Sequence, residues 1–223
     1  MNASVGIEPV DGSLRAEPVE ALVNRQPPRA IGAVTSPGGT TPPSPPGATL
    51  WFTGLPSAGK STIAHALSDR LIADGHRVQV LDGDEVRPHL SQGLGFSRED
   101  RDINVRRIGW VARLLAAHGV VVLVPVIAPY AAARDAVRDD HVAAGVPFAE
   151  IYVSTSLEVA ESRDVKGLYA KARNGELTGM TGVDDPYERP ARPELVIDTG
   201  RVDLAAGVDQ AGSLLLAITE KER

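Results

Sequence analysis

A short glycine-rich motif constrains the fold of this chain more than any other feature. Residues 54–62 read Gly-Leu-Pro-Ser-Ala-Gly-Lys-Ser-Thr, which matches the pattern G-x-x-x-x-G-K-[ST]. The motif follows an apolar run, Ala48–Thr53, that is typical of a strand, and it opens a helical pattern, Lys60–Asp74. Backbone N–H groups of such a loop surround a polyanion, and the helix turns its positive end toward it. The sequence therefore predicts a phosphate-binding loop for a nucleoside triphosphate.

The residue types within this loop have separate expected roles. We expect Lys60 to reach the β- and γ-phosphates and Ser61 to place its hydroxyl on Mg²⁺. An ordinary Gly-rich turn before a helix is the alternative, and the flanking strand and helix disfavour it. The expected nucleotide contacts are Gly54, Leu55, Pro56, Ser57, Ala58, Gly59, Lys60, Ser61 and Thr62.

Apolar runs alternate with helical patterns along the rest of the chain. Five strands are predicted, at residues 48–53, 77–81, 120–127, 149–153 and 194–197. Helices are predicted at residues 60–74, 98–118, 131–144, 157–163 and about 203–219. This order is typical of an α/β fold in which helices cover both faces of a five-stranded parallel sheet.

The alternation fails between residues 164 and 192, where the chain is charged and rich in glycine. Long irregular segments inside a domain often act as lids over a site, so we name residues 164–192 the lid segment. Its cations Lys166, Lys171 and Arg173 could neutralise substrate charge, although a mobile surface loop with solvated cations is an equal alternative.

Composition narrows the setting in which the chain works. The formal net charge of −6 argues against broad nucleic-acid binding, and no apolar run approaches the roughly 20 residues that span a bilayer. The absence of cysteine fits a reducing compartment, so we expect a cytoplasmic protein. Residues 1–47 hold nine of the 17 prolines and are predicted to be a disordered tail before a domain at 48–223. A docking role for the tail is a less favoured alternative to a plain linker.

Ligands of parallel sheets bind beyond the carboxyl ends of the strands, which makes the residues after each strand candidates for the site. Asp82 and Asp84 follow the second predicted strand and could serve an acceptor hydroxyl or a Mg²⁺-bound water; helix capping is the alternative. Arg101 and Asn104 share one helix face and could grip an oxyanion, and a solvated charged face is equally compatible. The third strand ends in Val126–Tyr130, which suits a pocket wall.

Taken together, these residues resemble the adenylylsulfate kinases (APS kinases) over about residues 48–200. The resemblance implies the P-loop kinase fold, with ATP and Mg²⁺ as cofactors. The matching elements are Gly54–Thr62, Leu81–Asp84, Leu94–Ser97, Asp100, Arg101, Asn104, Arg106–Gly109, Pro129, Tyr130, Lys166–Tyr169, Lys171–Arg173, Thr181, Gly182, Pro186–Glu188 and Pro193–Leu195.

The family's roles carry over to matching positions. Asp84 is implied to be the base or orienting group for the acceptor hydroxyl. Asp82 is implied to support the site, and Lys60 is the third implied catalytic residue. Arg163 and Thr199 are implied to border the adenine of ATP. The implied contacts of the acceptor nucleotide are Asp84, Arg87, Phe96 (stacking on its adenine), Arg101, Asn104, Ile127, Ala128, Lys166, Leu168 and Met180. A homodimer and a sulfate adenylyltransferase partner are also expected, with no nucleic-acid or membrane partner.

The chain departs from the family pattern at several positions. The family usually has a serine, assigned as a phosphoserine intermediate, where this chain has Ala128, so that covalent intermediate is excluded here. Met180 replaces an aromatic residue, and Ile103 and Trp110 replace acidic residues. We therefore predict direct transfer of phosphate from ATP to the 3′-hydroxyl of adenosine 5′-phosphosulfate. The alternatives are a kinase of another modified nucleotide, such as a nucleoside diphosphoramidate, and a catalytically silent nucleotide-binding partner.

Overall fold

The computed structural model describes residues 47–220 of the 223-residue chain. The tail expected at residues 1–47 lies, apart from Gly47, outside the described residues. Within residues 47–220, none of the helices combines the length and apolar character needed to cross a membrane.

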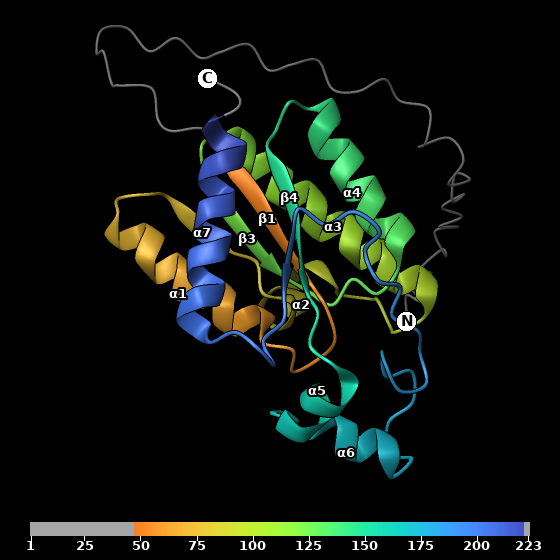
Figure 1. Cartoon of the computed structure of the whole chain (residues 1–223). Helices are drawn as coiled ribbons and strands as arrows, with labels where there is room; N and C mark the ends of the chain where they lie inside the picture. Colours follow the sequence, from red (N-terminus) through yellow and green to blue (C-terminus); the bar gives the residue numbers. More distant parts are fainter. Residues whose placement is uncertain (1–46, 221–223) are drawn as a thin grey trace, which may run out of the picture. The chain divides into compact units, whose positions relative to one another are not determined.

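A parallel sheet of five strands forms the centre of the described structure, as predicted (Figure 1). Its spatial order is β2-β3-β1-β4-β5, with β1 in the middle. In register, Leu50 of β1 lies opposite Leu123 of β3 on one side and opposite Ala149 of β4 on the other. The strands are β1 Ala48–Thr53, β2 Val78–Val80, β3 Val121–Pro125, β4 Phe148–Val153 and β5 Leu195–Ile197.

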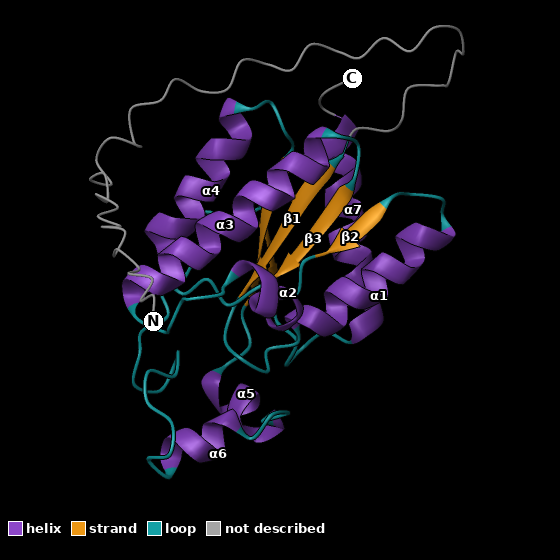
Figure 2. Cartoon of the chain, turned by 180° about the vertical axis from the view of Figure 1, so that it is seen from behind, coloured by secondary structure: helices purple, strands orange, loops and turns teal. Residues whose placement is uncertain are grey.

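Helices cover both faces of the sheet, because successive side chains of a strand point to opposite faces. Helices α1 and α7 pack on the face that carries Leu50 and Phe52, whereas α3 and α4 pack on the face that carries Trp51 (Figures 1 and 2). The helices are α1 Lys60–Ala73, α2 Gly83–Leu90, α3 Arg98–Ala117, α4 Ala131–Ala143, α5 Leu157–Arg163, α6 Leu168–Arg173 and α7 Leu204–Glu220.

Two short helices, α2 and α6, were not predicted from the sequence. Helix α2 has eight residues and none of them is buried, so it shows no apolar stripe. Helix α6 has six residues and lies within the lid segment, where the expectation of irregular chain throughout is wrong. The side chain of Asp82 caps α2, whereas α6 begins after Gly167 without a side-chain cap.

Helices α3 and α4 pack closely at Gly109. A Cβ atom added to Gly109 would lie 2.6 Å from Cγ2 of Val137, closer than a real contact allows. Valine has little rotamer freedom with which to yield. Gly109 is therefore needed for the close approach of the two helices.

We expect Gly109→Ala to lower the free energy of unfolding by about 1–3 kcal/mol through overpacking. The matched control is Gly212→Ala in α7, where a Cβ would meet Leu67 at 3.7 Å; it should be neutral or stabilise by up to about 1 kcal/mol. Urea unfolding of both variants measures the difference. Equal stability of Gly109→Ala and the wild type would contradict the packing argument.

Candidate functional site

The site lies at the carboxyl edge of the sheet, where the segments after β1, β2, β3 and β4 lie close together and the lid segment stands over them (Figure 1). All five strands are parallel, so each of them ends at the same edge. Residues far apart in the sequence are thereby brought to one place. The segment after β1 is the predicted phosphate-binding loop.

Glycine is required at two points of the phosphate-binding loop. Gly54 has a φ of 149°, and a Cβ there would lie 2.5 Å from the carbonyl oxygen of Val153. Gly59, with a φ of 101°, occupies the cap position immediately before α1. The loop can therefore pass close to β4 and turn directly into the helix, which aims its N-terminus at the loop.

Lys60 is buried beneath this loop. Its Nζ donates hydrogen bonds to the carbonyl oxygens of Gly54, at 3.0 Å, and of Leu55, at 2.7 Å. Burial lowers the pKa of the Lys60 ammonium to about 8, and the nearby carboxylates of Asp82 and Asp84 oppose this shift. The positive charge of the buried Lys60 is only partly compensated by its neighbours. A phosphate group could complete that compensation, so the ammonium is suited to bind phosphate.

Two carboxylates follow β2, and they have different environments. Asp82 caps α2: its Oδ1 accepts from the backbone N–H of Asp84 at 2.9 Å, and its Oδ2 accepts from the Ser61 hydroxyl at 2.5 Å. Asp84 has a side chain that is 71% exposed and forms an ion pair with Lys166 of the lid segment. Capping thus explains Asp82, whereas the exposed Asp84 pairs with the lid segment and has no capping role.

A second group of predicted residues surrounds Phe96, which is 63% exposed. The guanidinium of Arg87 lies 4.1 Å from the centre of its ring, and that of Arg101 lies 5.8 Å away. The side-chain oxygen of Asn104 accepts a hydrogen bond from Ser91. The structure therefore brings Arg87, Phe96 and Arg101 together, with Asn104 held by Ser91.

Arg101 also reaches the lid segment. Its guanidinium donates to the carbonyl oxygen of Gly179 at 2.5 Å and to the hydroxyl of Thr181 at 2.8 Å. Because Arg101 also donates to the carbonyl oxygen of Phe96 at 2.9 Å, it links the lid segment to the start of α3.

The segment after β3 is held by its neighbours. Thr53 donates to the carbonyl oxygen of Ile127 at 2.6 Å. Ala128 is buried and has a φ of 43°, in the left-handed region that non-glycine residues rarely adopt. The backbone here is therefore fixed in an unusual conformation, and the Ala128 side chain offers no hydroxyl.

The lid segment packs on the phosphate-binding loop through Tyr169, whose hydroxyl donates to the carbonyl oxygen of Pro56 at 3.1 Å. Burial raises the pKa of Tyr169 to about 12, so it stays a donor at neutral pH. Met180 is 5% exposed and packs with Tyr169, and Leu168 borders the same cluster. A contact between Met180 and an acceptor nucleotide stays a prediction.

Arg163 and Thr199 lie together beside Ala58 of the phosphate-binding loop. Arg163 donates to the backbone oxygen of Thr199 at 2.8 Å, and the Thr199 hydroxyl donates to the carbonyl oxygen of Ala58, also at 2.8 Å. Thr155 shares this contact, at 3.2 Å from the same oxygen, and was missed in the sequence. Its position two residues after β4 was the signal that could have identified it.

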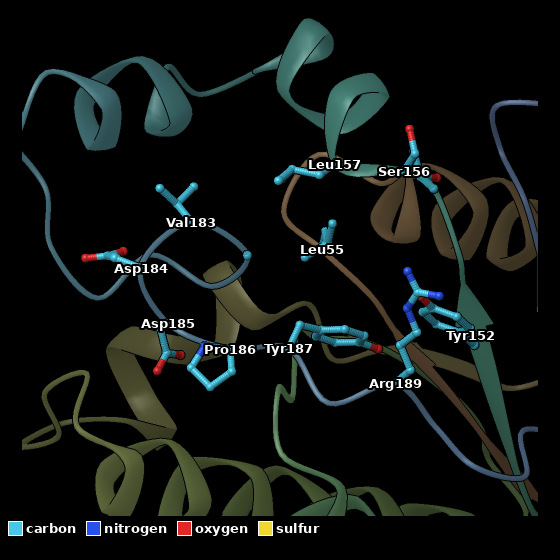
Figure 3. A pocket seen from close by; sticks show the side chains of 12 residues that line it. Leu55, Tyr152, Ser156, Leu157, Val183, Asp184, Asp185, Pro186, Tyr187 and Arg189 are labelled. Atoms are coloured by element: carbon cyan, nitrogen blue, oxygen red, sulfur yellow. The ribbon is translucent and has the colours of Figure 1, made fainter.

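A cavity of about 510 Å³ opens between the phosphate-binding loop, the end of β4 and the returning part of the lid segment (Figure 3). Leu55 and Leu157 line one part of it, and Tyr152 and Tyr187, whose rings stack, line another. Tyr152 was not identified from the sequence, and Tyr187, within the matched element Pro186–Glu188, was given no role, because the two side chains meet only after the chain returns from the lid segment.

Comparison with known proteins agrees with this geometry. The family model described as adenylylsulphate kinase matches residues 46–198. A probable adenylyl-sulfate kinase of Synechocystis is 54% identical over 162 residues, which cover 73% of this chain and 89% of the relative. The adenylyl-sulfate kinase of Myxococcus xanthus is 56% identical over 159 residues, covering 71% of this chain and 85% of the relative.

Solved structures give the same result. The APS kinase of Mycobacterium tuberculosis, in complex with AMPPNP and APS, has a TM-score of 0.74 and 45% identity, covering 77% of this chain and 98% of its own. A gluconokinase of Sinorhizobium meliloti, with a TM-score of 0.52, 22% identity and coverage of 79% and 95%, shares the fold alone. The fold is thus that of a P-loop kinase, and the chain is a kinase that belongs to the adenylylsulfate kinase family.

Proposed function

We propose that this kinase transfers the γ-phosphate of ATP to the 3′-hydroxyl of adenosine 5′-phosphosulfate, giving 3′-phosphoadenylyl sulfate. The observation that carries the proposal is the position of Asp84. Its carboxylate pairs with Lys166 of the lid segment and lies near enough to Lys60 to affect the pKa of that lysine. A carboxylate between the donor loop and the lid segment is suited to orient an acceptor hydroxyl.

The donor side is built from the phosphate-binding loop. Lys60 supplies the cation for the β- and γ-phosphates, while Arg163 and Thr199 border the position proposed for the adenine. Ser61 and Asp82 present two oxygen ligands 2.5 Å apart, a donor set that suits Mg²⁺ together with phosphate oxygens and water. When bound, the metal neutralises charge on the phosphates.

The acceptor side is built around Phe96. An exposed ring flanked by two guanidinium groups fits a nucleotide that carries an aromatic base and anionic groups. In the transfer, the acceptor hydroxyl gives its proton to Asp84 and its oxygen attacks the γ-phosphorus. The bond to the β–γ bridging oxygen breaks, and ADP leaves with that electron pair.

Transfer is proposed to be direct, without a phosphorylated enzyme intermediate. The methyl group of Ala128 has no oxygen to accept phosphate, and its backbone carbonyl accepts from Arg134 at 2.6 Å. In-line positioning of the two nucleotides lowers the barrier to transfer, so the reaction needs no such intermediate. The proposal also retains the cytoplasmic homodimer, and the sulfate adenylyltransferase partner, that the family resemblance implies.

A different acceptor is less favoured by the structure. Met180 and Ile103 are the two positions that differ from the family pattern and favour another acceptor. Met180 packs inside the small cluster of the lid segment, and Ile103 is 39% exposed on α3, opposite the face that packs on the sheet. Neither change alters the group formed by Arg87, Phe96 and Arg101.

We expect turnover of ATP to depend on adenosine 5′-phosphosulfate. The assay compares ADP release with ATP alone, with adenosine 5′-phosphosulfate, and with a nucleoside diphosphoramidate. Turnover only with the diphosphoramidate would replace the proposed acceptor, and ATP binding without any acceptor-dependent turnover would indicate a silent nucleotide-binding protein.

Asp84→Asn should lower kcat by about 100-fold or more, because the amide cannot take the hydroxyl proton, and should leave ATP affinity nearly unchanged. Lys60→Ala should damage both kcat and ATP affinity. Glu85→Gln, which removes the neighbouring exposed carboxylate of α2, is the matched control and should keep kcat within about twofold. Near-normal kcat in Asp84→Asn would show that its assigned role is wrong.

ATP affinity should fall as the pH rises above about 8. The free protein loses the Lys60 proton near that pH, whereas the bound triphosphate favours the charged form, so binding takes up a proton. The loss approaches tenfold per pH unit until the pKa of the complex is reached. Calorimetry in two buffers of different ionisation enthalpy measures the proton uptake. Lys60→Met is expected to lose this pH dependence; a flat affinity between about pH 7 and 9.5 in the wild type would contradict the prediction.

A further inference from the structure

A buried arginine of α4, Arg134, connects three parts of the structure. The proposed function gives this residue no role. Arg134 is 3% exposed. Its Nε donates to Oε1 of Glu150 at 2.7 Å, its Nη1 to the carbonyl oxygen of Ala128 at 2.6 Å, and its Nη2 to the carbonyl oxygen of Glu188 at 2.7 Å. The guanidinium is thus engaged in three directions, which its rigid planar fork suits and a lysine does not.

Two of these three partners are backbone carbonyls of neighbouring segments, one of which carries the expected acceptor contacts Ile127 and Ala128. Ala128 belongs to the segment after β3, and Glu188 lies in the last part of the lid segment. Ala128 has a positive φ, a conformation that persists only when the surrounding structure fixes it. The hydrogen bond from Arg134 to the Ala128 carbonyl is one contact that fixes it.

The same two segments are joined by a second set of contacts. The backbone N–H of Glu188 donates to the carbonyl oxygen of Pro129 at 2.8 Å, and a Glu188 carboxylate oxygen accepts from the N–H of Ala131, also at 2.8 Å. The hydroxyl of Tyr130 donates to Asp185 at 2.9 Å. The last part of the lid segment is therefore hydrogen-bonded to the segment after β3, and Arg134 contacts both segments.

We propose that Arg134 is a positioning residue for the acceptor nucleotide. By holding the carbonyls of Ala128 and Glu188, it fixes the segment that carries the expected acceptor contacts Ile127 and Ala128 against the last part of the lid segment. Arg134 acts through these backbone groups and is not a catalytic residue. The inference rests on the proposed function, since it concerns the acceptor site of that reaction.

A matched comparison is available one helical turn away. Arg138 shares the partner Glu150, at 3.3 Å, but its second partner is Glu194, at 2.5 Å, immediately before β5. Strand β5 is parallel to the others, so the residue before it lies at the edge of the sheet opposite the site. Both arginines contribute to the same ion-pair network, and only Arg134 contacts the two carbonyls.

The experiment compares three proteins with the wild type: Arg134→Lys, the double variant Arg134→Met with Glu150→Gln, and Arg138→Gln. Lysine keeps the charge beside Glu150, and the double variant avoids leaving Glu150 charged without Arg134, so each preserves folding in a different way. We expect both Arg134 variants to raise KM for adenosine 5′-phosphosulfate about tenfold or more while KM for ATP stays within about twofold. Arg138→Gln should leave both KM values unchanged.

An unchanged KM for the acceptor in the folded Arg134 variants would overturn the inference, as would equal rises in both KM values. Hydrogen exchange gives a readout independent of turnover: the amides of Ala131 and Glu188 should exchange faster in the Arg134 variants and not in Arg138→Gln. If wild-type turnover does not respond to the acceptor, the proposed function fails. Exchange of these amides then decides whether Arg134 holds the two segments, and unchanged exchange overturns the inference as well.

Discussion

The structure depends on the complete burial of β1 between two neighbouring strands. All six of its residues are buried, and the strand pairs in parallel with β3 on one side and β4 on the other. The phosphate-binding loop therefore leaves from the centre of the sheet, with the ends of β3 and β4 beside it. Because the strands are parallel, the groups that follow them meet at this edge.

Charge at the site is organised around the buried cation Lys60. Taking an ammonium out of water is unfavourable, and two backbone carbonyls with the nearby carboxylates Asp82 and Asp84 offset only part of that cost. A bound polyanion completes the compensation. The lid segment adds a second cation, Lys166, which pairs with Asp84 at the place where the proposed acceptor hydroxyl would bind.

The sequence predicted all five strands and five of the seven helices that the structure describes. The strands were found because four of them are largely apolar and β2 alternates apolar with polar residues. Helix α2 was missed because it buries none of its residues, and α6 was missed because it lies inside a charged, Gly-rich segment. For the site, Lys60, Ser61, Asp82 and Asp84 were expected near one another and lie so. Thr155 and Arg134 were missed because their partners are distant in the sequence, and Tyr187 was matched to the family pattern without a role.

The sequence by itself determined local structure. The motif at residues 54–62 must turn from a strand into a helix, and this turn places its glycines and its lysine. The two carboxylates after β2 belong with it, since they follow directly from the end of a strand. Only the tertiary structure decided that Asp82 caps α2 while Asp84 meets Lys166, 82 residues further along the chain. It also decided that Arg134 meets Glu188, 54 residues away. Such contacts form because packing of the sheet and helices brings distant segments together. Short-range sequence patterns do not predict which distant residues will meet.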